Sequence, residues 1–330
     1  SAVRLLDALY AKIAGRPLAL CDANDVDGIA SAALFLRRHP DGVVVLAYPT
    51  DVQKGRWIKW LRWNFVADLP CPGKADLRAD HHVTNKPCAA AEFYDPEAPA
   101  SAVLALKALG LSGDPVAEEI AEAARQTDTA NIVDDAVRDL DLAVRYAKYG
   151  EKLLVARALA EKGLKALEDP AIAALVERGR KLAAIVDALA QAIPARKTLA
   201  VYSPVKLPIS YRSLAIALQK KGAVYVNIFV RLGRGRYRLY CGAERGSGYD
   251  CTKIATAMGG GGHRYAAGAV VKAPLLDPDK PLRAFLELAA PDILYVIGQC
   301  PSNIKTQCVP IQYDEKGVQP SGERTSAELT

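Results

Sequence analysis

The feature that most constrains the fold is a series of short apolar segments that alternate with helical patterns in the first half of the chain. Five segments have the length and apolar content of strands: 18–22, 43–48, 65–68, 76–80 and 91–95. Segments with helical periodicity fall between or after them, at 29–38, 54–63 and 101–109. Near-continuous apolar strands separated by helices are typical of parallel sheets covered by helices. We therefore predict an α/β fold whose N-terminal domain contains a parallel sheet.

The length of 330 residues favours two domains. Residues 115–193 are rich in Ala, Leu, Glu and Lys and predict a helical extension of the first domain. From residue 198 onward, strand patterns and short helices indicate a smaller mixed α/β domain. Towards the end, Ser, Gln, Thr and Pro rise and periodicity fades. We expect a first domain over 1–195, a second over 196–290, and a partly disordered tail over 291–330.

Composition bears on the location of the protein. No apolar run reaches the roughly 18–20 residues of a membrane span, so we expect no membrane association. The first 15 residues, with Asp7 inside an amphipathic pattern, predict a helix and not a signal peptide. Seven scattered cysteines without a CxxC motif fit a reduced, cytoplasmic protein better than a disulfide framework. A single Met and abundant Ala, Arg, Lys and Glu are typical of heat-adapted proteins.

Positive charge is concentrated in one part of the chain. Residues 205–272 contain twelve Lys and Arg and two acidic residues, a net charge of +10; because the whole chain carries +6, the remainder carries −4. This asymmetry favours a polyanion as partner, that is, nucleotides or short single-stranded RNA or DNA. The alternative is a sheet edge whose Lys and Arg prevent aggregation.

Acidic residues and histidines follow several of the predicted strands. Asp25, Asp27 and Gly28 follow the segment 18–22, Asp68 ends the segment 65–68, and Asp80 is followed by His81 and His82. Asp128 lies in a later helical segment. Taken alone, DxDG slightly favours a helix cap with one solvated Asp. Because the carboxyl ends of parallel strands meet at one edge of a sheet, their convergence favours a metal site there.

The donor types constrain the metal. Carboxylate oxygens with one or two imidazoles suit Mn²⁺ or Mg²⁺, with Zn²⁺ or Co²⁺ as alternatives. Two divalent ions bridged by a carboxylate are a standard arrangement for phosphoester hydrolysis, in which one ion activates water and the other stabilises phosphoryl charge. We expect two ions per chain.

A run of four glycines is the second candidate binding feature. Gly259, Gly260, Gly261 and Gly262 follow a helical segment and precede His263 and Arg264. Such a run leaves backbone N–H groups able to approach an anion. The alternative is a flexible hinge with His263 in solvent.

With these motifs, the sequence resembles the DHH phosphoesterase superfamily, in the subgroup with the DHH-associated C-terminal domain. The resemblance covers about residues 15–275 and rests on "DVDGIASA" (25–32), Asp68, "ADHH" (79–82), Asp128 and "GGGGHRYAAGA" (259–269). That superfamily includes RecJ-type nucleases, nanoRNases that also dephosphorylate 3′-phosphoadenosine 5′-phosphate, cyclic-dinucleotide phosphodiesterases and family II pyrophosphatases. The last use a different C-terminal domain, so the glycine run argues against them.

The resemblance implies a role for each matched residue. Asp25 would bind the first metal, Asp27, His81 and Asp128 the second, and Asp68 both. His82 would contact the substrate phosphate, and Asp80 would orient a histidine. The residues Gly259, Gly260, Gly261, Gly262, His263, Arg264 and Arg245 would bind the phosphates of the substrate.

One position departs from the family pattern. The superfamily usually has a histidine four residues before the first Asp of DxDG, and here that position is Cys21. A thiolate can bind a metal but prefers softer ions. Alternatively, Asp22 or Asn24 takes its place, the first metal site is weak and the chain binds one ion, or Cys21 is a small buried residue.

These observations lead to two hypotheses of different classes. The first is a metal-dependent exonuclease or nanoRNase acting on short single-stranded oligonucleotides, with nucleotide phosphatase or cyclic-dinucleotide phosphodiesterase as alternatives. The second is a nucleic-acid-binding scaffold of a replication or repair complex that has lost catalytic strength, to which Cys21 points. A homodimer is compatible with both.

Overall fold

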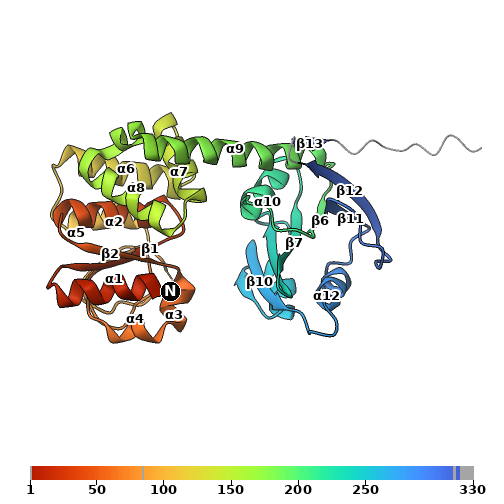
Figure 1. Ribbon diagram of the computed structural model, residues 1–330, viewed down its shortest axis with the longest axis horizontal. Helices are drawn as coiled ribbons and strands as arrows, with labels where there is room; N and C mark the ends of the chain where they lie inside the picture. Colours follow the sequence, from red (N-terminus) through yellow and green to blue (C-terminus); the bar gives the residue numbers. More distant parts are fainter. Residues whose placement is uncertain (1, 84, 315–316, 320–330) are drawn as a thin grey trace, which may run out of the picture. The chain divides into compact units, whose positions relative to one another are not determined.

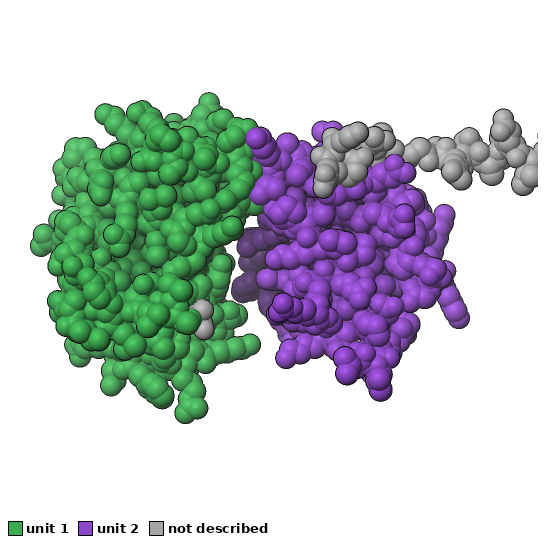
Figure 2. Space-filling view, viewed as in Figure 1, with its two compact units in different colours: residues 1–180 green, residues 181–330 purple. Residues whose placement is uncertain are grey.

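The computed structural model describes residues 2–83, 85–314 and 317–319. These residues form two compact units, 1–180 and 181–330, which Figure 2 shows in different colours. Each unit has its own sheet and its own buried core. The division falls inside one helix, α9 (Pro170–Ala192), which is continuous for 23 residues. The division lies before the expected 195 because the last part of α9, with Val186 and Leu189, packs in the core of the second unit.

The first unit contains the predicted parallel sheet. Its strands run in the order β2-β1-β3-β4-β5, and every neighbouring pair is parallel. Strands β1 and β2 are fully buried, as their continuous apolar sequences require. The bounds are β1 (Leu18–Asp22), β2 (Val43–Ala47), β3 (Trp63–Ala67), β4 (Ala75–Asp80) and β5 (Ala89–Tyr94).

Helices cover both faces of this sheet (Figure 1). One face is covered by α1, α3 and α4, and the other by α2 and α5, with α6 to α9 packed beyond them. The bounds are α1 (Ala2–Ile13), α2 (Val26–Arg38), α3 (Pro49–Lys54), α4 (Arg56–Trp60), α5 (Ser101–Ala108), α6 (Pro115–Asp128), α7 (Asp135–Tyr146), α8 (Tyr149–Lys162) and a 3₁₀ segment, η1 (Gly163–Glu168). The expectation of one helix over 54–63 is wrong. Gly55 has extended backbone angles and separates α3 from α4, and Trp63 begins β3.

The second unit is built on an eight-stranded mixed sheet. Its order is β13-β12-β11-β6-β7-β8-β10-β9; strands β12, β11, β6 and β7 are mutually parallel, whereas β8, β10, β9 and β13 pair antiparallel to their neighbours. Helix α10 packs on one face, and α11 and α12 pack on the other. The bounds are β6 (Thr198–Ser203), α10 (Tyr211–Lys220), β7 (Tyr225–Gly233), β8 (Arg236–Ala243), α11 (Cys251–Ala257), β9 (Gly261–His263), β10 (Ala266–Lys272), α12 (Lys280–Ala289), β11 (Ile293–Ile297), β12 (Gln307–Asp314) and β13 (Gly317–Gln319).

The expected tail over 291–330 requires correction. Residues 293–297 form β11, which lies between β6 and β12 and is buried along most of its length. The backbone of this strand pairs with β6 on one side and with β12 on the other, and its apolar side chains are largely buried. The segment therefore belongs to the second unit. Residues 315–316 and 320–330 lie outside the described residues.

The cysteines differ from the expectation of a fully reduced chain. The structure pairs Cys71 with Cys88, Cys241 with Cys251 and Cys300 with Cys308, with Cα–Cα distances of 5.9, 5.5 and 6.1 Å that suit disulfides. Cys21 alone is free, and it is buried. Intracellular proteins of hyperthermophiles are often rich in disulfides, so the pairing agrees with the heat-adapted composition. No helix in the described part of the chain is both long and apolar enough to cross a membrane.

Candidate metal centre

The carboxyl ends of three neighbouring strands bring the acidic residues together, as their parallel register requires. Cys21 of β1 pairs with Ala67 of β3, and Ala67 pairs with Ala79 of β4. The next residues along the chain are Asp22, Asp68 and Asp80. They therefore lie level with one another, at the carboxyl ends of β1, β3 and β4. This edge is the common site of ligand binding in open parallel sheets.

Gly28 fixes the start of α2 against the end of β1. A Cβ atom at this position would lie 2.3 Å from the carbonyl oxygen of Asp22, a distance that no side chain tolerates. Glycine therefore allows the helix to begin in direct contact with the strand end. As a result, Asp25, which precedes α2, lies next to Asp22, and Asp27 lies in the first turn of the helix.

Asp68 adopts an unusual backbone conformation immediately after β3. Its φ angle is 59°, in the left-handed region that Asp tolerates better than most residues. Its backbone N–H still donates to the carbonyl of Ala79, at 3.1 Å. The strained turn places its carboxylate in the cluster, and such strain is concentrated at functional sites.

Three groups of side chains in the described part of the chain bring their ligand atoms within 4.8 Å of one another. The groups are Asp22, Asp25 and Asp68; Asp68, His81 and His82; and Asp27, His81 and Asp128. Asp68 belongs to the first two groups, and His81 belongs to the last two.

His81 is oriented so that one ring nitrogen faces the carboxylates. Its Nδ1 lies 3.0 Å from the carbonyl oxygen of Ala98, which fixes Nδ1 as the donor nitrogen. Its Nε2 lies 3.6 Å from Asp128 Oδ2, 3.8 Å from Asp27 Oδ2 and 3.9 Å from Asp68 Oδ1. An imidazole that donates from Nδ1 to a backbone carbonyl and turns Nε2 towards carboxylates is a typical arrangement of a metal ligand.

His82 has a different environment from its neighbour. Its Nδ1 lies 2.9 Å from Asp80 Oδ1 and 3.4 Å from Asp68 Oδ1. The hydrogen bond with Asp80 raises the pKa of His82, although partial burial acts in the opposite direction. With 48% of its side chain exposed, His82 offers a positive charge that remains accessible from solvent.

Asp80 is fully buried and is held by a network of donors. Arg78, also fully buried, pairs with Asp80 and donates from Nε and Nη2 to the carbonyl of Leu69. Asn85 donates its amide N–H to Asp80 Oδ2, the oxygen that Arg78 also contacts, at 2.8 Å. Asp80 therefore positions His82 and does not face the metal groups.

Burial raises the pKa of the cluster's carboxyl groups. Removal from water brings the pKa of Asp22 to about 7 and that of Asp27 to about 8, and repulsion from Asp25 adds to both. The pKa of Asp68 is raised well above its usual value by burial and by neighbouring carboxylates, and burial also raises that of Asp128. A divalent cation would relieve this repulsion, so the donor set fits one.

Two residues of the site carry no signal in the sequence. Ser101 at the start of α5 donates its backbone N–H to Asp27 at 2.7 Å and its hydroxyl to Asp68 at 3.1 Å. Lys152 of α8 is buried and donates its ammonium group to the carbonyl of Ala23. Burial lowers the pKa of Lys152, while the charges of Asp22 and Asp25 act against this effect. Both residues lie far along the chain from the DxDG motif, and only packing brings them there.

The structure leaves Cys21 out of the metal groups, although it lies close to their carboxylates. Its side chain is fully buried in the core beneath α2; burial, and after it the charges of Asp68 and Asp22, raise the pKa of its thiol well above the usual value. Cys21 belongs to none of the three groups formed by described residues, whereas Asp22 belongs to one. Of the alternatives for this position, Asp22 and a buried small residue agree with the geometry.

The backbone of the glycine run makes hydrogen bonds within the protein that differ from the expected contacts with an anion. Gly259 and Gly260 donate their N–H groups to the carbonyls of Thr256 and Ala255 at the end of α11, so these two groups are not available to an anion. Gly261–His263 form β9, the last strand in the sheet order. A Cβ atom on Gly260 would lie 2.1 Å from the carbonyl oxygen of Gly268, so this close approach requires glycine.

Side chains near β9 add exposed positive charge. The His263 ring stacks on Tyr265, with centroids 5.7 Å apart, and Arg245 lies 4.4 Å from the centroid of the same tyrosine. Arg264 instead lies 3.6 Å from Asp250 and is partly neutralised. The structure thus brings His263 and Arg245 together and directs Arg264 to another partner.

Three comparisons with known proteins bear on the fold. No protein-family model and no curated protein matches the sequence. Among solved structures, the pGpG-specific phosphodiesterase PggH from Vibrio cholerae matches with a TM-score of 0.62 and 17% identity, over 83% of this chain and 99% of that one. The DHH domain of a member of the S1P family of ribosomal proteins matches with a TM-score of 0.55 and 12% identity, over 87% and 90%.

RecJ from Thermus thermophilus, solved in complex with Mg²⁺, matches with a TM-score of 0.51 and 14% identity. The match covers 93% of this chain and 54% of RecJ, so the chain spans about half the length of that nuclease. These likenesses show that the chain has the α/β fold of the DHH-domain proteins.

Proposed function

We propose that the chain is a metal-dependent phosphoesterase that hydrolyses phosphodiester bonds in short single-stranded oligonucleotides. The observation that carries this proposal is the orientation of His81, whose Nε2 faces Asp27, Asp68 and Asp128 while its Nδ1 is held by Ala98. The match to PggH, which by its name acts on the dinucleotide pGpG, supports a short substrate.

The residues divide into two proposed ion sites that share one carboxylate. Asp22, Asp25 and Asp68 would hold one divalent ion, and Asp27, His81, Asp128 and Asp68 the other. Mn²⁺ or Mg²⁺ suits these oxygen-rich donors, and a solved RecJ structure contains Mg²⁺. When bound, such ions supply activation of water and stabilisation of phosphoryl charge.

The remaining residues bind and orient. We assign His82 to the phosphoryl group under attack, because it is partly exposed and its bond to Asp80 favours the charged imidazolium. An ion pair and hydrogen bond to a developing anion stabilise the transition state more than the ground state. Ser101 and Ala102 hold both oxygens of Asp27 at 2.7 Å, which keeps the carboxylate in one orientation. Gly261, Gly262, His263 and Arg245 are proposed contacts for the phosphates of the substrate.

The test is hydrolysis of 5′-labelled di- to pentanucleotides of RNA and DNA in the presence of Mn²⁺. We expect cleavage by the wild type and its loss in Asp68→Asn and His81→Ala, whereas His82→Asn lowers kcat by about 10²–10³-fold. Asp76→Asn, which alters an exposed carboxylate paired with Arg62, is the matched control and should leave the rate unchanged.

The same assay separates the alternatives. Including 3′-phosphoadenosine 5′-phosphate, cyclic dinucleotides and long single strands in the panel identifies a nucleotide phosphatase, a cyclic-dinucleotide phosphodiesterase or a processive nuclease. The panel is repeated with Mg²⁺, Zn²⁺ and Co²⁺ in place of Mn²⁺. Binding of single strands without hydrolysis of any substrate, whichever metal is present, would contradict the proposed enzymatic activity and favour a nucleic-acid-binding scaffold.

A further inference from the structure

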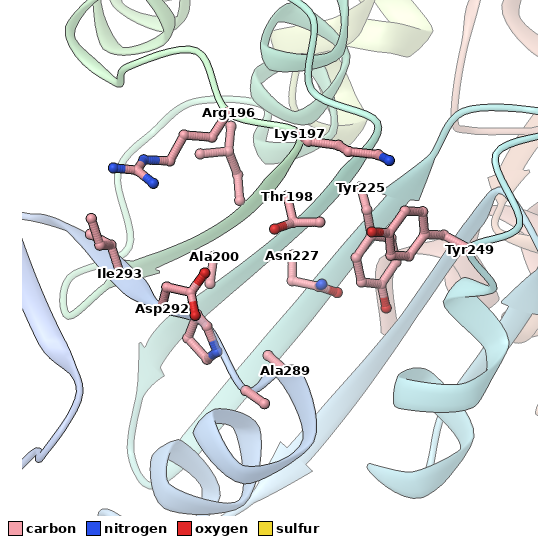
Figure 3. Close-up of a pocket in the computed structure, with 13 residues that line it drawn as sticks. Arg196, Lys197, Thr198, Ala200, Tyr225, Asn227, Tyr249, Ala289, Asp292 and Ile293 are labelled. Atoms are coloured by element: carbon pink, nitrogen blue, oxygen red, sulfur yellow. The ribbon is translucent and has the colours of Figure 1, made fainter.

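The second unit contains a cavity that the metal centre and the glycine run do not explain. It has a volume of about 430 Å³, within the range of small-molecule sites. Its walls come from the first residues of β6 and β7, the turn between α12 and β11, and Tyr249. All of these lining residues belong to the second unit (Figure 3).

The cavity wall includes a buried amide with an unsatisfied polar atom. Asn227 of β7 is only 2% exposed, and its Oδ1 has no hydrogen-bond partner in the described part of the chain. Burial raises the pKa of Tyr225, and a hydrogen bond from Asn227 acts against that rise, so the amide N–H group of Asn227 has a partner while its oxygen has none. A buried carbonyl oxygen without a donor is costly, and a ligand with an N–H group would satisfy it.

Two tyrosines provide an aromatic surface beside Asn227. The rings of Tyr225 and Tyr249 stack with centroids 4.7 Å apart and planes at 11°. Both tyrosines also line a neighbouring hollow of about 270 Å³, so the pair stands between two open spaces. A flat ring can therefore stack on this pair in the same way that bases stack on aromatic side chains.

Charged groups occupy other parts of the cavity wall. In Figure 3 the tyrosines lie at one end, Arg196 and Asp292 lie at the other, and Asn227 lies between them. Arg196 uses Nε to donate to the hydroxyl of Tyr295, at 2.8 Å, which orients its guanidinium group and leaves the two terminal nitrogens as donors. The Asp292 carboxylate is an acceptor for hydroxyl groups.

We infer that this cavity binds a nucleoside monophosphate. The base stacks on the Tyr225–Tyr249 pair and donates an N–H group to Asn227 Oδ1, the ribose hydroxyls donate to Asp292, and Arg196 binds the phosphate. This inference deepens the proposed function by adding a nucleotide subsite to the second unit, and it rests on that function only for the choice of nucleotides as the ligand class.

The experiment is a calorimetric titration of the full chain with AMP, adenosine and ribose 5-phosphate, with EDTA present so that nothing is hydrolysed. We expect AMP to bind more tightly than adenosine, and ribose 5-phosphate to bind most weakly. Tyr249→Ala should weaken AMP at least tenfold. Arg196→Gln should weaken AMP but leave adenosine unchanged, which assigns the phosphate contact. Tyr10→Ala, which removes an exposed tyrosine from α1, is the matched control.

Asn227→Leu keeps the test independent of folding. Because it removes the unsatisfied amide oxygen, at the cost of one hydrogen bond to the half-buried Tyr225, and keeps a side chain of similar size, the melting temperature should change little while AMP affinity falls at least tenfold. Absence of AMP binding at millimolar concentrations overturns the inference, as does AMP binding that these variants do not change.

The two proposals fail separately. Asp68→Asn should bind AMP as the wild type does, because Asp68 lies in the first unit. If AMP binds as described but no oligonucleotide is cleaved, the nucleotide subsite stands and the proposed function falls. If oligonucleotides are cleaved but AMP binding depends on His263 and not on Asn227, the subsite is overturned and the proposed function stands.

Discussion

At the scale of single residues, the adjacent histidines have different environments, and the reason is their hydrogen-bond partners. The Nδ1 atom of His81 is hydrogen-bonded to the carbonyl oxygen of Ala98, and its Nε2 faces carboxylates. The Nδ1 atom of His82 is instead hydrogen-bonded to the carboxylate of Asp80. Asp80 is able to serve His82 because Arg78 balances its buried charge. The DHH motif is therefore supported by an arginine two residues before it.

Replacing Arg78 by Met should destabilise the fold strongly. The substitution leaves Asp80 buried without its guanidinium partner and the carbonyl of Leu69 without its donor. Removal of one partner from a buried ion pair costs about 3–5 kcal/mol. Denaturant unfolding measures this loss. Arg62→Met, which breaks an exposed pair with Asp76, is the control and should cost about 1 kcal/mol or less. An equal, small effect of both substitutions would argue against the network.

At the scale of elements, the sheet edge concentrates acidic groups whose protonation depends on the metal. The pKa values of Asp22 and Asp27, about 7 and about 8, lie above the ordinary value of 3.8. At a pH between 3.8 and these raised pKa values, the metal-free folded chain keeps protons on Asp22 and Asp27 that the unfolded chain has released. Its free energy of unfolding therefore falls as the pH rises from about 4 to about 8.

Metal should reverse this trend. Because bound cations displace the protons, the stabilisation by Mn²⁺ should grow between pH 6 and pH 8. Calorimetric melting temperatures at several pH values, with EDTA and with Mn²⁺, check both statements. Asp27→Asn removes one of the two groups and should flatten the dependence seen with EDTA. A melting temperature of the EDTA-treated wild type that rises relative to Asp27→Asn over this range would contradict the assignment.

The elements also show what the sequence could and could not predict. Strand β1 was predicted with its observed bounds because Leu-Ala-Leu-Cys-Asp is a buried apolar run followed by a turn. Strand β11 was missed, although Ile-Leu-Tyr-Val-Ile has the same character, because the composition around it changed. The short β9 has no apolar pattern, and only its pairing with β10 makes it a strand.

The same distinction holds for the site. Asp25, Asp27, Asp68 and His81 were predicted from motifs that follow strands, and Asp128 from a helical segment; the structure places all five in overlapping groups of ligand atoms. Lys152 donates to a carbonyl 129 residues away, and Ser101 donates to Asp27 74 residues away. Such contacts depend on how α8 and α5 pack, which local sequence patterns do not encode.

At the scale of the whole molecule, disulfides are distributed over both units. Cys71–Cys88 lies in the first unit and joins the segments that follow Asp68 and His82; the other two pairs lie in the second. A thiol titration of the unfolded, unreduced chain should find one free thiol, that of Cys21, and seven after reduction.

Loss of the Cys71–Cys88 pair should lower stability. The crosslink spans 17 residues, and removal of such a loop constraint costs about 2–4 kcal/mol. Unfolding of the double variant Cys71→Ser/Cys88→Ser measures this cost, and Cys21→Ser serves as a control that removes no crosslink. Seven free thiols in the unreduced chain would contradict the pairing.

The central claim concerns the molecule as a metal-dependent enzyme, and the position of the metal tests it most directly. Anomalous scattering from crystals grown with Mn²⁺ locates the ions without reference to activity. The account predicts two peaks, one among Asp22, Asp25 and Asp68 and one among Asp27, Asp68, His81 and Asp128, and loss of both in Asp68→Asn. Crystals of the wild type grown in millimolar Mn²⁺ with no peak at this edge of the sheet would contradict it.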